Sequence, residues 1–179
     1  CFASVSQKDS GSREWLIDVL RQADNDPWRN KVRRAWKEPA TLEALATDID
    51  VRQHPPSFLL LLANKLPIAS PSRLDLEQRV QFAYPGDFWA NHGLAFDLGR
   101  AGKDVAAIRY YTAALSLRPD NPGVLLNRAG SLRRAGEPEA AIADLQRAIA
   151  VAPRYVAAYD NLGQVLHDQK KVDEAIDAY

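Results

Sequence analysis

The sequence of 179 residues has no methionine, one cysteine and three histidines. The single cysteine, Cys1, excludes a disulfide within the chain and fits a reducing compartment, so we expect a cytoplasmic protein. The longest apolar run, residues 58–63, is much shorter than the roughly 18 residues that a membrane-spanning helix needs. We therefore expect no membrane partner. The chain starts with neither a methionine nor an apolar leader, which favours an internal segment of a longer protein.

An excess of either charge is also missing, because lysine plus arginine and aspartate plus glutamate each number 23. A neutral chain has no overall attraction for nucleic acid or for an anionic surface, so we expect no nucleic-acid partner. Hydrophobic residues make up 46% and charged residues 26% of the chain, which is typical of a folded domain and not of a disordered tail.

Residue patterns that carry catalysis or bind metals are absent as well. His54, His92 and His167 are far apart, and none has a second metal-binding side chain three or four residues later in the chain. Residues 99–103 resemble a phosphate-binding loop only superficially, because the spacing from glycine to lysine is short and Asp104 stands where serine or threonine is needed. We therefore predict no catalytic residue, no metal site and no cofactor.

The first half of the chain shows breaks and apolar stripes that predict short helices. Residues 1–12 are polar and lack helical periodicity, so we expect a flexible tail there. Asp26 followed by Pro27 is a strong helix start, because aspartate caps a helix N-terminus and proline suits the first turn. The predicted helices cover residues 13–23, 27–37, 39–49, 58–66 and 72–84. We expect residues 13–85 to form irregular helical hairpins.

A strip of basic side chains follows one side of the predicted helix 27–37, where Arg29, Arg33 and Lys37 are spaced four residues apart. Such a strip binds an acidic partner or a phosphate backbone, or it forms a solvated face whose charge nearby carboxylates balance. The second interpretation is favoured, since most charged helix faces are of this kind. Trp28 and Trp36 lie on another side of this helix, and we expect them in the core.

The second half of the chain repeats itself with a period of about 34 residues. In the first two units, Ala107, Ile108, Tyr111, Ala114 and Pro119 correspond to Ala141, Ile142, Leu145, Ala148 and Pro153. We call this constant spacing, from Ala107 to Ala141, the repeat period. A third copy contains Tyr159, Asn161, Leu162, Gly163, Ala175, Ile176 and Tyr179. We place the units at 86–121, 122–155 and 156–179, the last of them truncated. Small residues such as Ala107 and Ala141 let paired helices approach closely, and each unit buries its apolar face on its neighbours.

These units resemble tetratricopeptide repeats, whose pattern has a tryptophan, a Leu-Gly pair, a tyrosine, then alanine, an aromatic residue, alanine and proline. The spacing matches over residues 122–179, whereas we place two extra residues in the inter-helix turn of the first unit, at 98–102. The resemblance implies an all-α fold, a right-handed α-α superhelix of helical hairpins. It also implies an inner groove that is lined by the first helix of each unit.

Three asparagines, Asn91, Asn127 and Asn161, are expected at the same place in these first helices. In similar arrays, side chains at this place line the groove and can hold the backbone of a bound peptide, since an amide offers both a donor and an acceptor. Local helix geometry is the alternative reason for asparagine there. Neighbouring arginines suit a ligand carboxylate. The predicted peptide-binding set is Asn91, Asn127, Asn161, Arg133, Arg134 and Gln164. Arrays that clamp a C-terminal carboxylate have a lysine and paired asparagines that the first unit lacks, which disfavours that ligand.

Two short segments, ADNDPWR at 23–29 and YPGDFW at 84–89, resemble the region before the repeats in large bacterial serine/threonine protein kinases of planctomycete type. That resemblance implies a regulatory or substrate-docking arm of a larger kinase, although the chain itself contains no kinase motif. The open C-terminal end, with Ala175, Ile176 and Tyr179, suggests self-assembly into a homo-oligomer as a third function. Our leading hypothesis is a scaffold that binds a partner protein or peptide and is not an enzyme.

Overall fold

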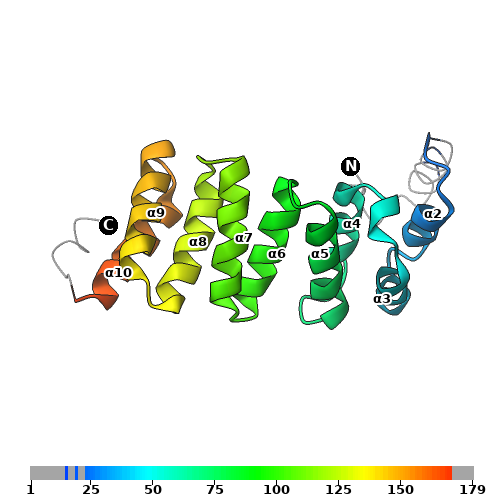
Figure 1. The fold of residues 1–179 in the computed structure, drawn as a ribbon, viewed down its shortest axis with the longest axis horizontal. Helices are drawn as coiled ribbons and strands as arrows, with labels where there is room; N and C mark the ends of the chain where they lie inside the picture. Colours follow the sequence, from blue (N-terminus) through cyan, green and yellow to red (C-terminus); the bar gives the residue numbers. More distant parts are fainter. Residues whose placement is uncertain (1–14, 16–18, 20–22, 171–179) are drawn as a thin grey trace.

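The computed structural model describes Trp15, Val19 and residues 23–170, which form helices and turns without a strand. The helices are α2 (Pro27–Arg34), α3 (Pro39–Asp48), α4 (Pro56–Ala63), α5 (Pro71–Ala83), α6 (Phe88–Arg100), α7 (Asp104–Leu117), α8 (Pro122–Ala135), α9 (Pro138–Val151) and α10 (Val156–Asp168), with a short 3-10 turn, η2 (Val51–Gln53), after α3. They stand side by side in chain order (Figure 1). The predicted all-α solenoid is therefore confirmed. The predicted helix 13–23 and the end of the third unit, 171–179, lie mostly or wholly outside the described residues.

Local sequence explains where these helices begin. Six of them have a proline in their first turn, where its missing N–H breaks no helical hydrogen bond. Asp26, Asp87 and Asn121 are N-caps whose side chains accept a hydrogen bond from the backbone N–H three residues later, at 2.7, 2.8 and 3.1 Å. The predicted start at Asp26 and Pro27 is confirmed, although α2 ends at Arg34, three residues earlier than expected.

The repeat period is regular through the first unit, so the predicted two-residue insertion at 98–102 is wrong. Helices α6 and α8 begin at Phe88 and Pro122, which are separated by the same spacing as Ala107 and Ala141. Helices α7 and α9 begin at Asp104 and Pro138, which are again one repeat period apart. The number of residues from the start of α6 to the start of α7 is therefore the same as from the start of α8 to the start of α9.

The hairpin α4–α5 keeps this period, although its sequence resembles the repeats only weakly. The last backbone N–H groups of α5, α7 and α9 belong to residues that are each one repeat period apart. These are Tyr84, Arg118 and Ala152, which donate to the carbonyl groups of Val80, Ala114 and Ala148. Helix α5 therefore occupies the place of the second helix of a further unit, directly before the first unit that the sequence reveals.

Glycine at the end of α8 is required by the backbone. Gly136 has φ of 83°, as Gly102 has φ of 72° at the equivalent turn. Since this left-handed region costs another residue roughly 1–2 kcal/mol, we expect Gly136→Ala to lower the free energy of unfolding by about 1 kcal/mol, measured by urea denaturation. Gly130→Ala in the same helix is the matched control. A Cβ there meets only Arg134 Nη1, at 3.5 Å, so it should stabilise by about 0.5–1 kcal/mol. Equal effects of the two substitutions on the free energy of unfolding would contradict a requirement for glycine at position 136.

Buried apolar residues form two clusters that meet between α5 and α6. The first cluster is built by α2 to α5 together with Ala90, and the second by α6 to α10. Ala107 and Ala141, the predicted small contact residues, are fully buried in the second cluster. Trp28 and Trp36 pack against the first cluster, which agrees with the expectation that they belong to the core.

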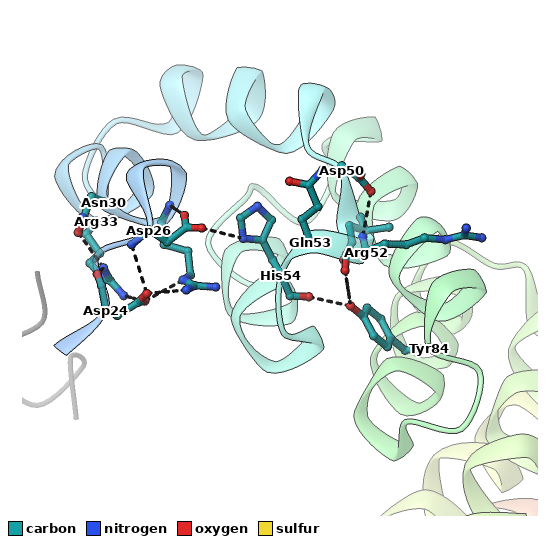
Figure 2. Close-up of polar contacts among 11 residues, drawn as sticks. Asp24, Asp26, Asn30, Arg33, Asp50, Arg52, Gln53, His54 and Tyr84 are labelled. Carbon is teal, nitrogen blue, oxygen red and sulfur yellow. Dashed lines mark hydrogen bonds and ion pairs between the residues drawn. The ribbon is translucent and has the colours of Figure 1, made fainter.

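Asp24 balances the charge of the basic strip on α2 (Figure 2). Its carboxylate accepts hydrogen bonds from Arg29 Nε at 2.7 Å, from Arg29 Nη2 at 2.5 Å and from Arg33 Nη2. The hydrogen bonds from Arg29, with those from Arg33, hold the pKa of Asp24 well below its usual range. The pairing with a carboxylate that the favoured interpretation expects is thus found for Arg29 and Arg33, although Arg33 is buried and not solvated.

Polar contacts around His54 join α2, the turn η2 and α5 (Figure 2). The Tyr84 hydroxyl donates to the His54 carbonyl group at 2.9 Å. His54 Nδ1 lies 3.8 Å from Asp26 Oδ2, and the His54 ring centroid is 4.5 Å from that of Trp28. These contacts hold the His54 backbone and ring, although the buried Nδ1 atom has no hydrogen-bond partner in the described part of the chain, and we assign His54 a structural role.

Candidate functional site

Asn91 lies inside the molecule and not on the groove. It is 0% exposed, and its Nδ2 atom donates to the Pro85 carbonyl group at 2.8 Å. The repeat period places Asn91 level with Leu125 in α8 and Tyr159 in α10. The Tyr159 hydroxyl donates to the Pro153 carbonyl group at 3.1 Å, and this bond corresponds to that of Asn91 two periods earlier. Asn91 is therefore a buried connector between α6 and the loop before it.

The residue of α6 that matches Asn127 and Asn161 is Gly93, which stands one repeat period before Asn127. The sequence prediction placed Asn91 level with Asn127 and Asn161, and this placement shifted α6 by two positions. Gly93 has no side chain. The position that carries an amide in α8 and α10 is therefore open in α6.

A groove of about 330 Å³ runs across the first helices of the three units, and we call it the central groove. It is lined by Phe96, Gly99, Arg100, Tyr111, Leu126, Asn127, Gly130, Arg134 and Asn161. Three predicted residues, Asn127, Arg134 and Asn161, are thus brought together from α8 and α10. Arg133 and Gln164, also predicted, are not among the residues that line it.

The arginines of this face differ in whether an acidic side chain balances their charge. Arg134 donates from Nε and Nη2 to Asp104 Oδ1, at 3.0 and 2.8 Å, and Arg133 is paired with Asp168 at 2.9 Å. Arg100 lies 5.8 Å from the Phe96 ring centroid and has no acidic partner within the described part of the chain. The central groove therefore carries a positive charge at Arg100.

The two asparagines of the central groove keep hydrogen-bonding capacity for a ligand. Asn161 donates from Nδ2 to the Ala157 carbonyl group at 2.8 Å, which leaves its oxygen as an acceptor. Asn127 is half-buried, and its amide makes no hydrogen bond to another described residue. Both ends of the Asn127 amide therefore remain available.

A second cavity, of about 430 Å³, lies where α4 and α5 meet α6, and we call it the junction pocket. It is lined by Ser57, Leu60, Leu61, Asn64, Arg73, Glu77, Trp89, His92, Gly93 and Phe96. Phe96 also lines the central groove, so the two cavities are neighbours along α6. Trp89 and Phe96 are 55% and 39% exposed. Exposed aromatic side chains grouped on one face are typical of an interaction surface.

The floor of the junction pocket is a buried cluster of charged side chains. Arg73 donates from Nε and Nη2 to the Asp97 carboxylate, the second of these bonds at 3.1 Å, and from Nη2 to Asn64 Oδ1 at 3.1 Å. Its Nε atom also lies 3.9 Å from Glu77 Oε1. Arg73 thereby ties α5 to both α4 and α6.

Burial changes the ionisation of two groups in the junction pocket. It raises the pKa of Glu77 to about 8, and the nearby Asp97 carboxylate acts in the same direction, while Arg73 opposes both. Burial also lowers the pKa of His92. The imidazole is therefore neutral near pH 7, and the charge of this pocket depends on Glu77.

Three residues that line the two cavities escape prediction from the sequence. Arg100 stands one repeat period before Arg134, so the correct register of α6 would have identified it. Phe96 and Trp89 look like ordinary apolar positions in the sequence. Nothing in the helical pattern distinguishes an exposed aromatic residue from a buried one.

Comparison with known proteins identifies the repeats. The fold is an α-solenoid in which the first helices of the three units line one groove. A family model described as "Tetratricopeptide repeat" matches residues 94–153 and 126–179. The chain therefore contains tetratricopeptide repeats over residues 94–179, as their sequence pattern predicts.

Curated relatives match between two fifths and two thirds of the chain. The chain is 35% identical over 74 residues to small glutamine-rich tetratricopeptide repeat-containing protein 2 of Mycosarcoma maydis, over 41% of this chain and 21% of that protein. It is 30% identical over 128 residues to the protein of the same name in Saccharomyces cerevisiae, over 68% and 36%. It is 40% identical over 73 residues to a heat-shock protein cognate co-chaperone of Aspergillus fumigatus, over 41% and 21%. The chain thus spans about a third or less of each relative.

Solved structures show the same fold. A MamA structure matches with a TM-score of 0.70 at 15% identity, over 94% of this chain and 93% of that one. MamA from Desulfovibrio magneticus RS-1 matches with a TM-score of 0.69 at 15% identity, over 95% and 93%. At this identity the likeness concerns the fold alone. These matches give no support to the resemblance to planctomycete-type kinases, and the kinase arm and the self-assembly through the C-terminal end stay predictions.

Two further features of the described residues bear on the ligand. None of the described helices combines the length and apolarity that crossing a lipid bilayer demands. Within the same part of the chain, no group of three or more histidine, cysteine, aspartate and glutamate side chains is placed to hold a metal ion.

Proposed function

We propose that the chain is a scaffold that binds an extended segment of a partner protein along the face formed by α6, α8 and α10. The observation that carries the proposal is the central groove. In it Asn127 and Asn161, one repeat apart, lie with Arg100 and Arg134, which are also one repeat apart. A row of equivalent side chains spaced by the repeat period suits a ligand that is itself extended and periodic.

The amides supply contacts that do not depend on the ligand sequence. Asn127 and the free oxygen of Asn161 can bond to the peptide groups of a bound segment. Each such bond contributes about 0.5–1.5 kcal/mol. Two of them hold a segment weakly and tolerate many sequences, so the preference for one ligand has to come from other side chains.

The arginines supply that preference. Arg100 lacks an acidic partner among the described residues, and Arg134 uses only Nε and Nη2 for its bonds to Asp104 and Ser131, which leaves Nη1 available. Guanidinium groups bind carboxylates with short, charge-assisted hydrogen bonds. The segment over the central groove is therefore expected to carry acidic side chains.

Relatives support a protein as the ligand. The relative from Aspergillus fumigatus is named as a co-chaperone of a heat-shock protein cognate, so its name refers to a protein partner. A further match, 29% identical over 73 residues, is Hsp70-Hsp90 organizing protein 2 of Arabidopsis thaliana, of which the chain covers 13%. A protein partner is therefore the ligand class that these names favour.

Replacing Asn127 and Asn161 together by alanine is expected to weaken the binding of acidic peptides about thirty-fold, since each lost amide bond is worth about 1 kcal/mol. A displayed peptide library selected on the wild-type chain supplies the peptide, and fluorescence anisotropy measures its affinity. Gln164→Ala is the control, because Gln164 lies on α10 outside the lining of the central groove. Unchanged affinity in the double variant, or a library without binders, would overturn the proposal.

A further inference from the structure

We propose that the junction pocket is a specificity site for one basic side chain, lysine or arginine, of the partner segment. The inference deepens the proposed function, on which it rests for the identity of the occupant. It gives the bound segment a direction: acidic residues over the central groove and one basic residue beyond Phe96, toward α4 and α5.

The floor of the pocket has a carboxyl group without a cation of its own. Glu77 is 2% exposed, and its Oε2 atom has no hydrogen-bond partner. The nearest guanidinium group, that of Arg73, is already engaged by Asp97. Two carboxyl groups thus share one arginine, and α4 and its C-cap contribute no charged side chain to the lining, which on that side consists of Ser57, Leu60, Leu61 and Asn64. When Glu77 ionises, the two carboxylates exceed the charge of Arg73 by one, and a basic side chain from outside would balance that charge.

Gly93 opens the way from the ligand face to this carboxyl group. A Cβ atom at Gly93 would lie 3.8 Å from Glu77 Oε1 and 4.0 Å from Leu60 Cδ2. In α8 and α10 the equivalent position is filled by Asn127 and Asn161. Among these three helices, α6 is thus the one that lacks an amide side chain at this position, and it is also the one in which this position faces the buried carboxyl group of Glu77.

Aromatic rings form the wall through which a basic side chain would pass. Trp89, His92 and Phe96 stand on one side of α6. The ring centroids of Trp89 and His92 are 5.9 Å apart, and those of His92 and Phe96 are 6.5 Å apart. Aromatic faces attract cations, and Trp89 and Phe96 already lie within 5.5 and 5.8 Å of the guanidinium groups of Arg118 and Arg100. The neutral imidazole of His92 adds no positive charge that would repel the ligand.

The pocket couples cation binding to proton release. Glu77 is largely protonated at neutral pH, and a cation beside it favours the carboxylate form. The charged groups that face Glu77 are Arg73 on its own helix and Asp97 on α6. The affinity for a cation should therefore rise about tenfold for each pH unit up to about pH 8 and remain level above it.

Two probes of the same shape test this site on the full chain. n-Butylguanidinium stays charged at every pH of interest, whereas n-butylurea is neutral. We expect n-butylguanidinium to shift the NMR signals of the Gly93 amide and the Trp89 indole, with an affinity that follows the pH dependence above. n-Butylurea should bind at least tenfold more weakly at about pH 8, without pH dependence. Equal affinities of the two probes would overturn the proposal.

Variants separate the carboxyl group from the shape of the pocket. Glu77→Gln should lower the affinity for n-butylguanidinium at least tenfold and abolish its pH dependence. Gly93→Asn, which adds the side chain found in α8 and α10 and keeps Glu77, should also block the probe. Gly86→Asn adds the same side chain outside the lining of both cavities, where a Cβ atom meets nothing within 4 Å, and should leave the probe unaffected. If Glu77→Gln does not fold, Gly93→Asn decides, and full binding by that variant would contradict the site.

The probes also distinguish this proposal from the wider one. One outcome is a peptide whose binding depends on Asn127 and Asn161, while n-butylguanidinium does not bind. This outcome would contradict the basic subsite and support the peptide-binding scaffold. Binding of n-butylguanidinium that requires Glu77, without any peptide binder, would keep the subsite as a cation site and remove the peptide groove. A peptide whose basic residue is needed by the wild type and not by Glu77→Gln would support both.

Discussion

Replacing Arg73 by methionine is expected to lower the free energy of unfolding by about 3–5 kcal/mol, the cost typical of removing one partner from a buried ion pair. Arg73 is the cation that balances Asp97, and both side chains are buried. Without it the Asp97 carboxylate stays inside the protein with no positive charge nearby, and α5 loses its bonds to α6 and Asn64. Since domains are stable by about 5–15 kcal/mol, this loss is large enough to measure by urea denaturation.

A surface ion pair provides the matched control. Arg147 is paired with Asp120 at 2.8 Å, and their side chains are 48% and 67% exposed. Arg147→Met should therefore cost at most about 1 kcal/mol. Equal costs for Arg73→Met and Arg147→Met would show that water balances the Asp97 charge, contrary to the buried geometry.

An apolar replacement of the whole cluster tests the reason for this cost. In the triple variant Arg73→Met, Glu77→Leu and Asp97→Leu, no charge is left without a partner. Replacing a buried ion pair by apolar residues of similar volume is often neutral or stabilising by about 1–4 kcal/mol. We expect the triple variant to be at least as stable as the wild type. A triple variant as unstable as Arg73→Met alone would assign the cost to packing.

The same cluster explains why the sequence reveals three units and hides a fourth. Arg73 and Glu77 stand one repeat period before Ala107 and Tyr111, two positions that define the repeat pattern and are buried in α7. Charged residues at those positions remove the apolar pattern on which recognition of a repeat depends. The backbone keeps the period because the Arg73–Asp97 bonds hold the helices together where apolar packing holds them elsewhere.

The sequence predicts well what depends on neighbours along the chain. Helix starts at Asp26 and Pro27 follow from local hydrogen bonding, and the small contact residues of α7 and α9 follow from the period. The register of α6 relative to the other repeats cannot be predicted in this way. A large apolar residue near the start of the helix is assumed to be the one that fills the core. In α6 that place is taken by Asn91, whose amide is satisfied by the loop before it. Such a substitution depends on a hydrogen bond that a pattern does not contain.

The two cores and the ligand face meet at one place. The N-terminal apolar cluster ends at α5 and the C-terminal one begins at α6, and the junction pocket opens between them. An apolar contact there would leave no polar group for a ligand to reach. The buried charges therefore give the scaffold a distinct chemistry at the end of its ligand face, at a cost in stability that depends on pH.

Glu77→Gln is expected to remove a pH dependence of stability that the wild type shows. The folded protein raises the Glu77 pKa from 4.5 to about 8, so it holds this proton more tightly than the unfolded chain does. The stabilising contribution is complete below about pH 4.5 and is lost as the pH rises to about 8. One proton changes stability by about 1.4 kcal/mol per pH unit. The wild type should thus lose about 2–3 kcal/mol between about pH 5.5 and about pH 7.5, and on the order of 4 kcal/mol in full.

The comparison of the two proteins isolates Glu77 from other titrating groups. The lowered pKa of His92 makes stability rise with pH up to about 6.5, and this contribution is present in both proteins and cancels in their difference. The difference in unfolding free energy, Glu77→Gln minus wild type, should therefore increase steadily with pH and level off above about pH 8. Urea denaturation at a series of pH values measures it. A constant difference would mean that Glu77 ionises with an ordinary pKa, and the proton release expected on cation binding would then be lost as well.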